Sequence, residues 1–204
     1  MGMEISMFDG CYTALITPMK KNYEVDLEGL RSLVEFQISE GVNGLLAVGT
    51  TGENPTLSHE ENIRVIREVY EVAGEKCVVI GGTGSNCTDK TIEMTREIYD
   101  FGVRCVLLVD PYYNGPSSLE IRKEYVEPVA SMFPEVQVIP YVIPGRTGTQ
   151  LLPQDLAILH SQFKNVRAVK EATGNIENMK LTRKLCGGDF DILSGDDDKT
   201  YEMM

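Results

Sequence analysis

The segment 165–174 places a lysine near the end of a short apolar run that is typical of a buried β-strand. Strand side chains alternate between two faces, so Ala168, Lys170 and Ala172 share one face while Glu171 points to the other. The small alanines leave space beside the amine, and burial lowers the pKa of an ammonium by desolvating its charged form. A neutral amine can attack a ketone carbon and form an imine. The alternative is a structural lysine paired with a carboxylate on a neighbouring strand.

Other polar residues follow the ends of several further apolar runs. They are Thr50 and Thr51, Tyr112 and Tyr113, Tyr141 and Arg146, and the segment 196–198. A barrel of parallel strands brings the carboxyl ends of its strands to one face, where such side chains can converge on a substrate. An open sheet would scatter them. This distribution favours a barrel whose catalytic face includes Lys170.

The chain alternates short apolar runs with longer amphipathic segments. The runs are continuous, which is typical of buried parallel strands, and cover 11–19, 44–49, 77–82, 103–110, 136–142, 166–172 and 190–194. Helices are predicted over 26–41, 58–74 and 88–102. A capping box of Ser58 and Glu61 begins the second helix and Gly74 ends it. Such alternation predicts an α/β fold with a parallel sheet, either closed as a (β/α)8 barrel or open and doubly wound.

The glycine-rich turn 81–86 does not fit the open, dinucleotide-binding alternative, because Cys87 occupies the place of the third glycine in GxGxxG. We therefore predict one (β/α)8 TIM barrel domain over residues 1–204. A barrel of this kind usually needs roughly 250 residues. We expect strands one to seven here, with the eighth strand and the C-terminal helical tail absent, so that strands one and seven present open edges.

Composition excludes several classes of partner. The 204 residues carry 19 Lys and Arg against 31 Asp and Glu, a formal charge of −12 that repels nucleic acid and anionic lipid. The apolar runs are too short to span a bilayer, so we expect a cytoplasmic protein. The first six residues match a loose myristoylation pattern without polybasic support, and we discount it. The cysteines and histidines lack metal-ligand spacing, so no metal site is predicted.

Four motifs in chain order resemble those of the dihydrodipicolinate synthase and N-acetylneuraminate lyase family. They are the GTTGE of residues 49–53, the DPYYNGP of 110–116, the YVIPGRTG of 141–148 and the VKEATG of 169–174. The resemblance spans nearly the whole chain and is more specific than any single motif. It implies a (β/α)8 barrel with a helical tail, a lysine imine with pyruvate, no cofactor, and a homotetramer.

The same resemblance assigns roles to individual residues. Lys170 matches the imine-forming lysine, and Tyr141 matches the tyrosine that moves protons during imine and enamine formation. A phenol can donate and accept a proton, but its ordinary pKa near 10 requires a hydrogen-bonded relay. Thr50 and Tyr113 match that relay, with Tyr113 reaching the site of an adjacent subunit. Thr51 matches the cradle for the pyruvate carboxylate.

The cradle lies in the turn that contains Gly49 and Gly52, which are therefore candidate substrate-binding residues. The two glycines also have a structural explanation, because a tight strand-to-helix turn requires glycine. Both explanations can be true at the same time. Arg146 could hold an incoming carboxylate through two parallel hydrogen bonds, which favours L-aspartate 4-semialdehyde as second substrate. Alternatively, Arg146 is a solvated charge in a loop and has no role in binding.

These residues imply condensation of pyruvate with L-aspartate 4-semialdehyde to 4-hydroxy-tetrahydrodipicolinate, a step toward diaminopimelate and lysine. Val142 departs from the family's usual asparagine, which leaves open a pyruvate-releasing sugar-acid aldolase of the 2-keto-3-deoxy-gluconate or N-acetylneuraminate type. Lys90 stands where lysine-inhibited members carry glutamate, so strong inhibition by lysine is not expected. A non-catalytic fragment and an anion binder built on residues 81–86 are further alternatives.

Overall fold

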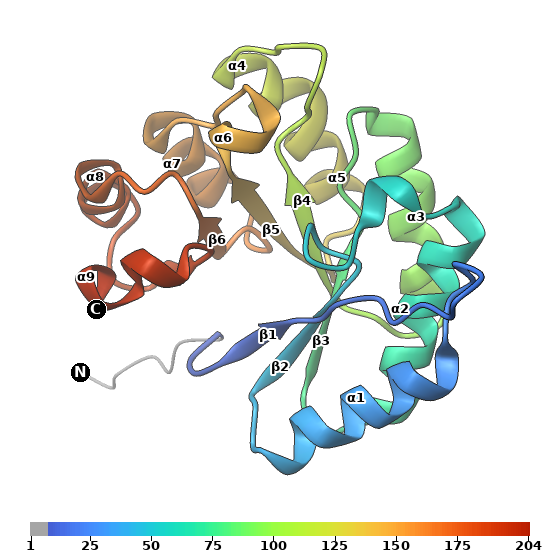
Figure 1. Ribbon diagram of the computed structural model, residues 1–204. Coiled ribbons are helices and arrows are strands. Elements are labelled where there is room, and N and C mark those ends of the chain that lie inside the picture. The colour runs from blue at the N-terminus through green and yellow to red at the C-terminus, as the bar shows by residue number, and fades with distance from the viewer. Residues whose placement is uncertain (1–7) are drawn as a thin grey trace. The chain divides into compact units, whose positions relative to one another are not determined.

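The computed structural model describes residues 8–204, so the myristoylation pattern at residues 1–6 lies outside the described part (Figure 1). The chain forms two compact units, which we describe separately. The N-terminal unit comprises Gly10–Thr83 and Ile92–Leu107, and the C-terminal unit comprises Gly84–Thr91 and Leu108–Met204 with Phe8 and Asp9. The single domain expected from the sequence stays a prediction. No helix within residues 8–204 is both long and apolar enough to cross a membrane.

The N-terminal unit is built on parallel strands that follow one another in chain order. These are β1 (Tyr12–Ala14), β2 (Gly44–Ala47), β3 (Val78–Gly82) and β4 (Cys105–Val109), whose last two residues belong to the other unit. The helices are α1 (Leu27–Ser39), α2 (His59–Ala73) and α3 (Thr88–Asp100), whose residues 88–91 belong to the other unit, with a short 3-10 turn η1 (Asn54–Thr56). Figure 1 shows α1 and α2 lying side by side.

The ends of α2 follow the chemistry predicted for them. The hydroxyl of Ser58 accepts the Glu61 N–H at 3.1 Å, and the Glu61 carboxylate accepts the Ser58 N–H at 2.8 Å. This reciprocal pair satisfies two donors that the first turn of a helix leaves without partners. Gly74, with φ of 54°, ends the helix in a conformation that favours glycine. The predicted capping box is therefore confirmed.

The C-terminal unit contains three further parallel strands, β5 (Gln137–Val142), β6 (Ala168–Glu171) and β7 (Asp191–Ser194). Its helices are α4 (Ser118–Glu120), the π-helical turn η2 (Ile121–Val126), α5 (Glu127–Met132), α6 (Pro144–Thr147), α7 (Pro153–Gln162), α8 (Ile176–Cys186), the 3-10 turn η3 (Asp197–Lys199) and α9 (Thr200–Met203). All seven predicted strands are present, and the pairs β1–β2, β2–β3, β3–β4, β5–β6 and β6–β7 are parallel. This is the βα repeat expected from the sequence.

Asn165 joins the end of α5 to the start of β5. Its side chain is 4% exposed, and its amide nitrogen donates to the carbonyls of Ala130, Phe133 and Val136 at 3.0–3.1 Å. Its own carbonyl accepts the Val138 N–H at 2.8 Å. One buried amide therefore satisfies the carbonyls of Ala130 and Val136, which regular structure leaves without donors, and adds a second donor to the Phe133 carbonyl, which also accepts the Val136 N–H at 3.0 Å.

Replacing Asn165 with alanine is expected to lower the free energy of unfolding by about 2 kcal/mol or more, because it leaves the Ala130 and Val136 carbonyls without donors and each such buried carbonyl costs about 1 kcal/mol or more. Urea unfolding followed by circular dichroism measures this change. The control is Asn114→Ala, which removes one exposed hydrogen bond to the Asn86 carbonyl and should cost less than about 1 kcal/mol. Equal effects of the two substitutions would contradict the assigned role of Asn165.

Candidate active site

Lys170 and Tyr141 lie side by side on neighbouring strands of the C-terminal unit. They are register partners in the parallel pair of β5 and β6. The Lys170 Nζ lies 4.5 Å from the centre of the Tyr141 ring, within the range of a cation–π contact. Tyr141 is 4% exposed. The two residues expected to form and protonate an imine are thus brought together by strand register.

The surroundings of Lys170 favour the neutral amine. Burial lowers the pKa of Lys170, and the nearby carboxylate of Asp197 opposes this shift only in part. Within residues 8–204 Lys170 forms no ion pair. The described chain therefore does not contain the alternative arrangement, in which a structural lysine pairs with a carboxylate on a neighbouring strand. A desolvated amine without a counter-ion is suited to nucleophilic attack.

Space beside the amine comes from three small residues. Ala168 and Ala172 flank Lys170 along the strand, as predicted. Gly195, directly after β7, is the third, and the sequence reasoning missed it. A Cβ atom at Gly195 would lie 3.0 Å from both the Lys170 Cε and the Ala172 Cβ, so a larger residue would press on the lysine. The position of Gly195 immediately after the predicted seventh strand is the feature of the sequence that could have identified it as a site residue.

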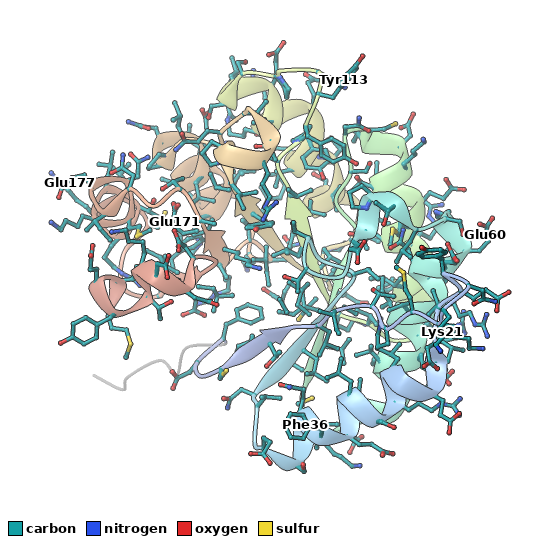
Figure 2. The ribbon with its side chains drawn as sticks, viewed as in Figure 1. Lys21, Phe36, Glu60, Tyr113, Glu171 and Glu177 are labelled. Atoms are coloured by element: carbon teal, nitrogen blue, oxygen red, sulfur yellow. The ribbon has the colours of Figure 1, made fainter. Side chains whose placement is uncertain are left out.

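Glu171 lies on the opposite face of β6, as the strand period predicts. It is 5% exposed and is labelled in Figure 2. Its carboxylate accepts the Thr173 N–H at 2.6 Å, and burial raises its pKa while that hydrogen bond opposes the rise. This buried carboxyl lies on the face of β6 opposite Lys170 and is not an ion-pair partner of the amine.

Tyr113 and Arg146 are carried by segments that follow β4 and β5. Tyr113 is 92% exposed, adopts φ of 75°, and projects from its loop in Figure 2. Arg146 is exposed in α6. Neither side chain forms a hydrogen bond or ion pair within the described residues. The structure therefore leaves both side chains accessible to a further molecule and does not join them to Lys170.

The GTTGE turn in the N-terminal unit is tightly built. The Gly52 N–H donates to the Gly49 carbonyl at 3.0 Å, and the Thr17 hydroxyl donates to the Gly52 carbonyl at 2.7 Å. A Cβ atom at Gly52 would lie 2.9 Å from the Val48 Cα, so the turn requires glycine. Val48 itself has φ of 47°, a strained value for a β-branched residue.

The turn thus has a structural role that requires glycine, and that role leaves its exposed threonines free to bind a ligand. Thr50 and Thr51 are both exposed. Because strain of the kind seen at Val48 gathers at ligand-binding turns, the geometry supports a binding role. The relay function of Thr50 and the carboxylate cradle at Thr51, Gly49 and Gly52 stay predictions.

A sequence profile described as the Dihydrodipicolinate synthetase family matches residues 7–204. The chain belongs to this family. Among curated relatives, the 4-hydroxy-tetrahydrodipicolinate synthase of Trichlorobacter lovleyi is 44% identical over 198 residues, covering 97% of this chain and 67% of that protein. The family resemblance inferred from the four motifs is confirmed.

Solved structures of the dihydrodipicolinate synthetase family are also similar. The dihydrodipicolinate synthase of Cyanidioschyzon merolae with lysine bound has a TM-score of 0.94 at 36% identity and covers 98% of this chain and 67% of its own. The enzyme of Aquifex aeolicus has a TM-score of 0.91 at 38% identity, covering 96% and 66%. The predicted fold class, a (β/α)8 barrel represented here by strands one to seven, is confirmed. The chain spans about two thirds of the length of these relatives.

Proposed function

We propose that the protein is a pyruvate-dependent lyase of the lysine-imine class. It condenses pyruvate with L-aspartate 4-semialdehyde to form 4-hydroxy-tetrahydrodipicolinate on the route to diaminopimelate and lysine. The observation that carries this proposal is the Lys170 amine, which is partly buried, has no ion-pair partner in residues 8–204 and lies against Tyr141, in a chain of the dihydrodipicolinate synthetase family. Relatives named 4-hydroxy-tetrahydrodipicolinate synthase support it.

In the proposed reaction the neutral Lys170 amine attacks C2 of pyruvate, and the resulting carbinolamine loses water to give an imine. Loss of a proton from C3 gives an enamine, whose carbon attacks the aldehyde of the second substrate. The amino group of that substrate then adds to the imine carbon and closes the ring, and Lys170 leaves as the free amine. Tyr141 donates and accepts the protons of these steps.

The imine nitrogen serves as the electron sink, so the proposed chemistry needs no metal or separate cofactor. Thr51 with Gly49 and Gly52 would hold the pyruvate carboxylate, and Thr50 and Tyr113 would extend the proton relay from Tyr141. We further propose a homotetramer in which Tyr113 serves an adjacent subunit, which suits its 92% exposure. A cytoplasmic location remains part of the proposal.

Borohydride reduction in the presence of pyruvate tests the proposal. Reduction converts the imine into a permanent secondary amine, which intact-protein mass analysis detects and peptide mapping assigns to a residue. We expect one adduct per chain, on Lys170. A folded protein that yields no adduct with Lys170 intact would show that the imine mechanism is wrong.

The second substrate is tested through Arg146. Replacing Arg146 with alanine is expected to raise KM for L-aspartate 4-semialdehyde about 10-fold or more, because a hydrogen-bonded pair between charged groups contributes about 1.5–3 kcal/mol. The yield of borohydride-trapped pyruvate should not change. Arg104→Ala is the control, since that guanidinium stacks 4.0 Å from the Tyr99 ring in the N-terminal unit.

Val142 keeps a sugar-acid aldolase as the second candidate, because it removes a hydrogen-bonding side chain beside Tyr141. The two candidates differ in the aldehyde that the enamine accepts. An unchanged KM in Arg146→Ala, together with faster turnover of sugar-derived aldehydes, would favour the aldolase over the semialdehyde reaction.

A further inference from the structure

Asp110 is a buried acid at the end of β4 that the proposed mechanism does not use. It is 1% exposed. Its Oδ2 accepts the Leu151 N–H at 2.9 Å, and its backbone N–H donates to the Tyr141 carbonyl at 3.0 Å. Its Oδ1 is buried without a hydrogen-bond partner in residues 8–204, and the carboxyl forms no ion pair there. A carboxylate in such a place would be an uncompensated buried charge.

Strand register places Asp110 in a row with a second acid. In a parallel pair, a residue whose N–H bonds to the carbonyl of residue 141 lies beside residue 142. Asp110 therefore lies beside Val142, which is the register partner of Glu171. The row of Asp110, Val142 and Glu171 faces away from Lys170, because successive strand residues alternate between faces. Val142 offers neither carboxyl a hydrogen-bond donor.

Within residues 8–204, no positively charged group contributes to the electrostatics of Asp110. Glu171 on β6 and Tyr125 in η2 interact with it, and Tyr112 interacts in turn with Tyr125. The Tyr125 hydroxyl donates to the Val109 carbonyl at 3.1 Å, and burial raises its pKa. Burial likewise raises the pKa of Asp110 to about 8, with the Leu151 N–H opposing this rise and Glu171 adding to it. The site therefore favours the protonated acid at neutral pH.

Asp110 also fixes the segment that contains α6. Its Oδ2 binds the Leu151 N–H, while the carbonyl of neighbouring Pro111 accepts the Thr149 hydroxyl at 3.0 Å. The Thr147 hydroxyl in turn donates to the Thr149 carbonyl at 3.0 Å. These contacts join the end of β4 to the chain that leaves α6, the helix that carries Arg146. Through its backbone, Asp110 contacts Tyr141 as well.

We propose that Asp110 is a positioning residue, held as the neutral acid, that fixes the Arg146 segment against the ends of β4 and β5. Ionisation places an uncompensated charge in a buried site beside Glu171. Although the Leu151 N–H favours that charge, the larger cost of desolvation favours local opening of this segment, which brings water to the carboxylate. The position of Arg146 then becomes less well defined at high pH. The effect on substrate rests on the proposed function, whereas the protonation state of Asp110 does not.

The protonation state is tested by ¹³C NMR of side-chain carboxyls in protein labelled at aspartate. The difference between wild type and Asp110→Asn assigns the Asp110 signal, and we expect it to titrate near pH 8. Glu171→Gln removes the like charge and should lower the midpoint. Titration of Asp110 at or below the ordinary value of an aspartic acid would overturn the proposal, whatever the outcome of the pyruvate trapping.

The positioning role is tested by stability and KM as functions of pH. Because the pKa of Asp110 is higher in the folded than in the unfolded chain, its contribution to stability is fully present below its ordinary value and is lost as the pH rises toward about 8. Asp110→Asn mimics the neutral acid and should be more stable than wild type at pH 8.5 and similar at pH 4.

We also expect KM for the semialdehyde to rise above pH 8 in wild type and to rise less in Asp110→Asn, with trapping of pyruvate unchanged in both. Identical pH profiles of stability and KM in the two proteins would overturn the positioning role. A raised titration midpoint with no trapped pyruvate would instead uphold the neutral acid and reject the proposed function, so the two failures are distinguishable.

Discussion

Replacing Lys170 with alanine is expected to eliminate the borohydride-trapped pyruvate adduct and to lower kcat by at least about 10³-fold, the scale on which removal of a covalent nucleophile acts. The reason is that Lys170 combines burial, a lowered pKa and the absence of an ion pair within residues 8–204. Initial rates with pyruvate and L-aspartate 4-semialdehyde, together with intact-protein mass after reduction, measure both effects.

The control is Lys180→Ala, which removes an exposed lysine of α8 that pairs with Glu177 at 2.7 Å. This variant should retain the adduct and full activity. Stability separates catalysis from structure, because loss of a lysine that holds a buried carboxylate would destabilise the fold by about 3–5 kcal/mol. We expect Lys170→Ala to be about as stable as wild type. An adduct that persists in Lys170→Ala would contradict the assignment.

Continuous apolar runs predicted all seven strands, since buried parallel strands leave that signal. The first run shows the limit of the method. It was predicted over 11–19, but β1 ends at Ala14. The Leu15 N–H still bonds to the Leu46 carbonyl, whereas Ile16 is 57% exposed and Pro18 has no N–H to donate. The apolar run therefore continues past the residues that pair with β2, and the prediction made from it was too long.

The candidate site was predictable as far as it depends on one strand. The period of two placed Lys170 opposite Glu171 and beside two alanines, and the structure confirms this arrangement. The sequence left open whether a carboxylate pairs with Lys170, because that depends on neighbours from other strands. Gly195 and the contact with Tyr141 depend on the registers of β6 with β7 and with β5.

The row of Asp110, Val142 and Glu171 was not predictable for the same reason. Its members are separated by 32 and 29 residues and meet only through the registers of three strands. From the sequence, Val142 indicated only that the hydrogen-bonding side chain of the family's usual asparagine is missing, and not what its loss changes. In the structure it separates two buried carboxyls, which turns that departure into a specific expectation about protonation.

Replacing Tyr141 with phenylalanine is expected to lower kcat about 10²-fold or more, within the range attributed to a positioned general acid or base. The substitution keeps the ring that lies 4.5 Å from the Lys170 Nζ and removes the hydroxyl that would move protons. Lys170 should therefore still form the adduct, but more slowly. Single-turnover trapping as a function of time, with steady-state rates, measures the two effects separately.

Tyr70→Phe in α2 is the matched control, because it removes a phenol hydroxyl from the N-terminal unit and keeps the ring packed against Phe101. It should leave both rates unchanged. If Tyr141→Phe formed the adduct as fast as wild type but turned over slowly, the hydroxyl would act after imine formation. If both rates matched wild type, proton transfer would have to come from another group, and the pairing of Tyr141 with Lys170 would be one of packing alone.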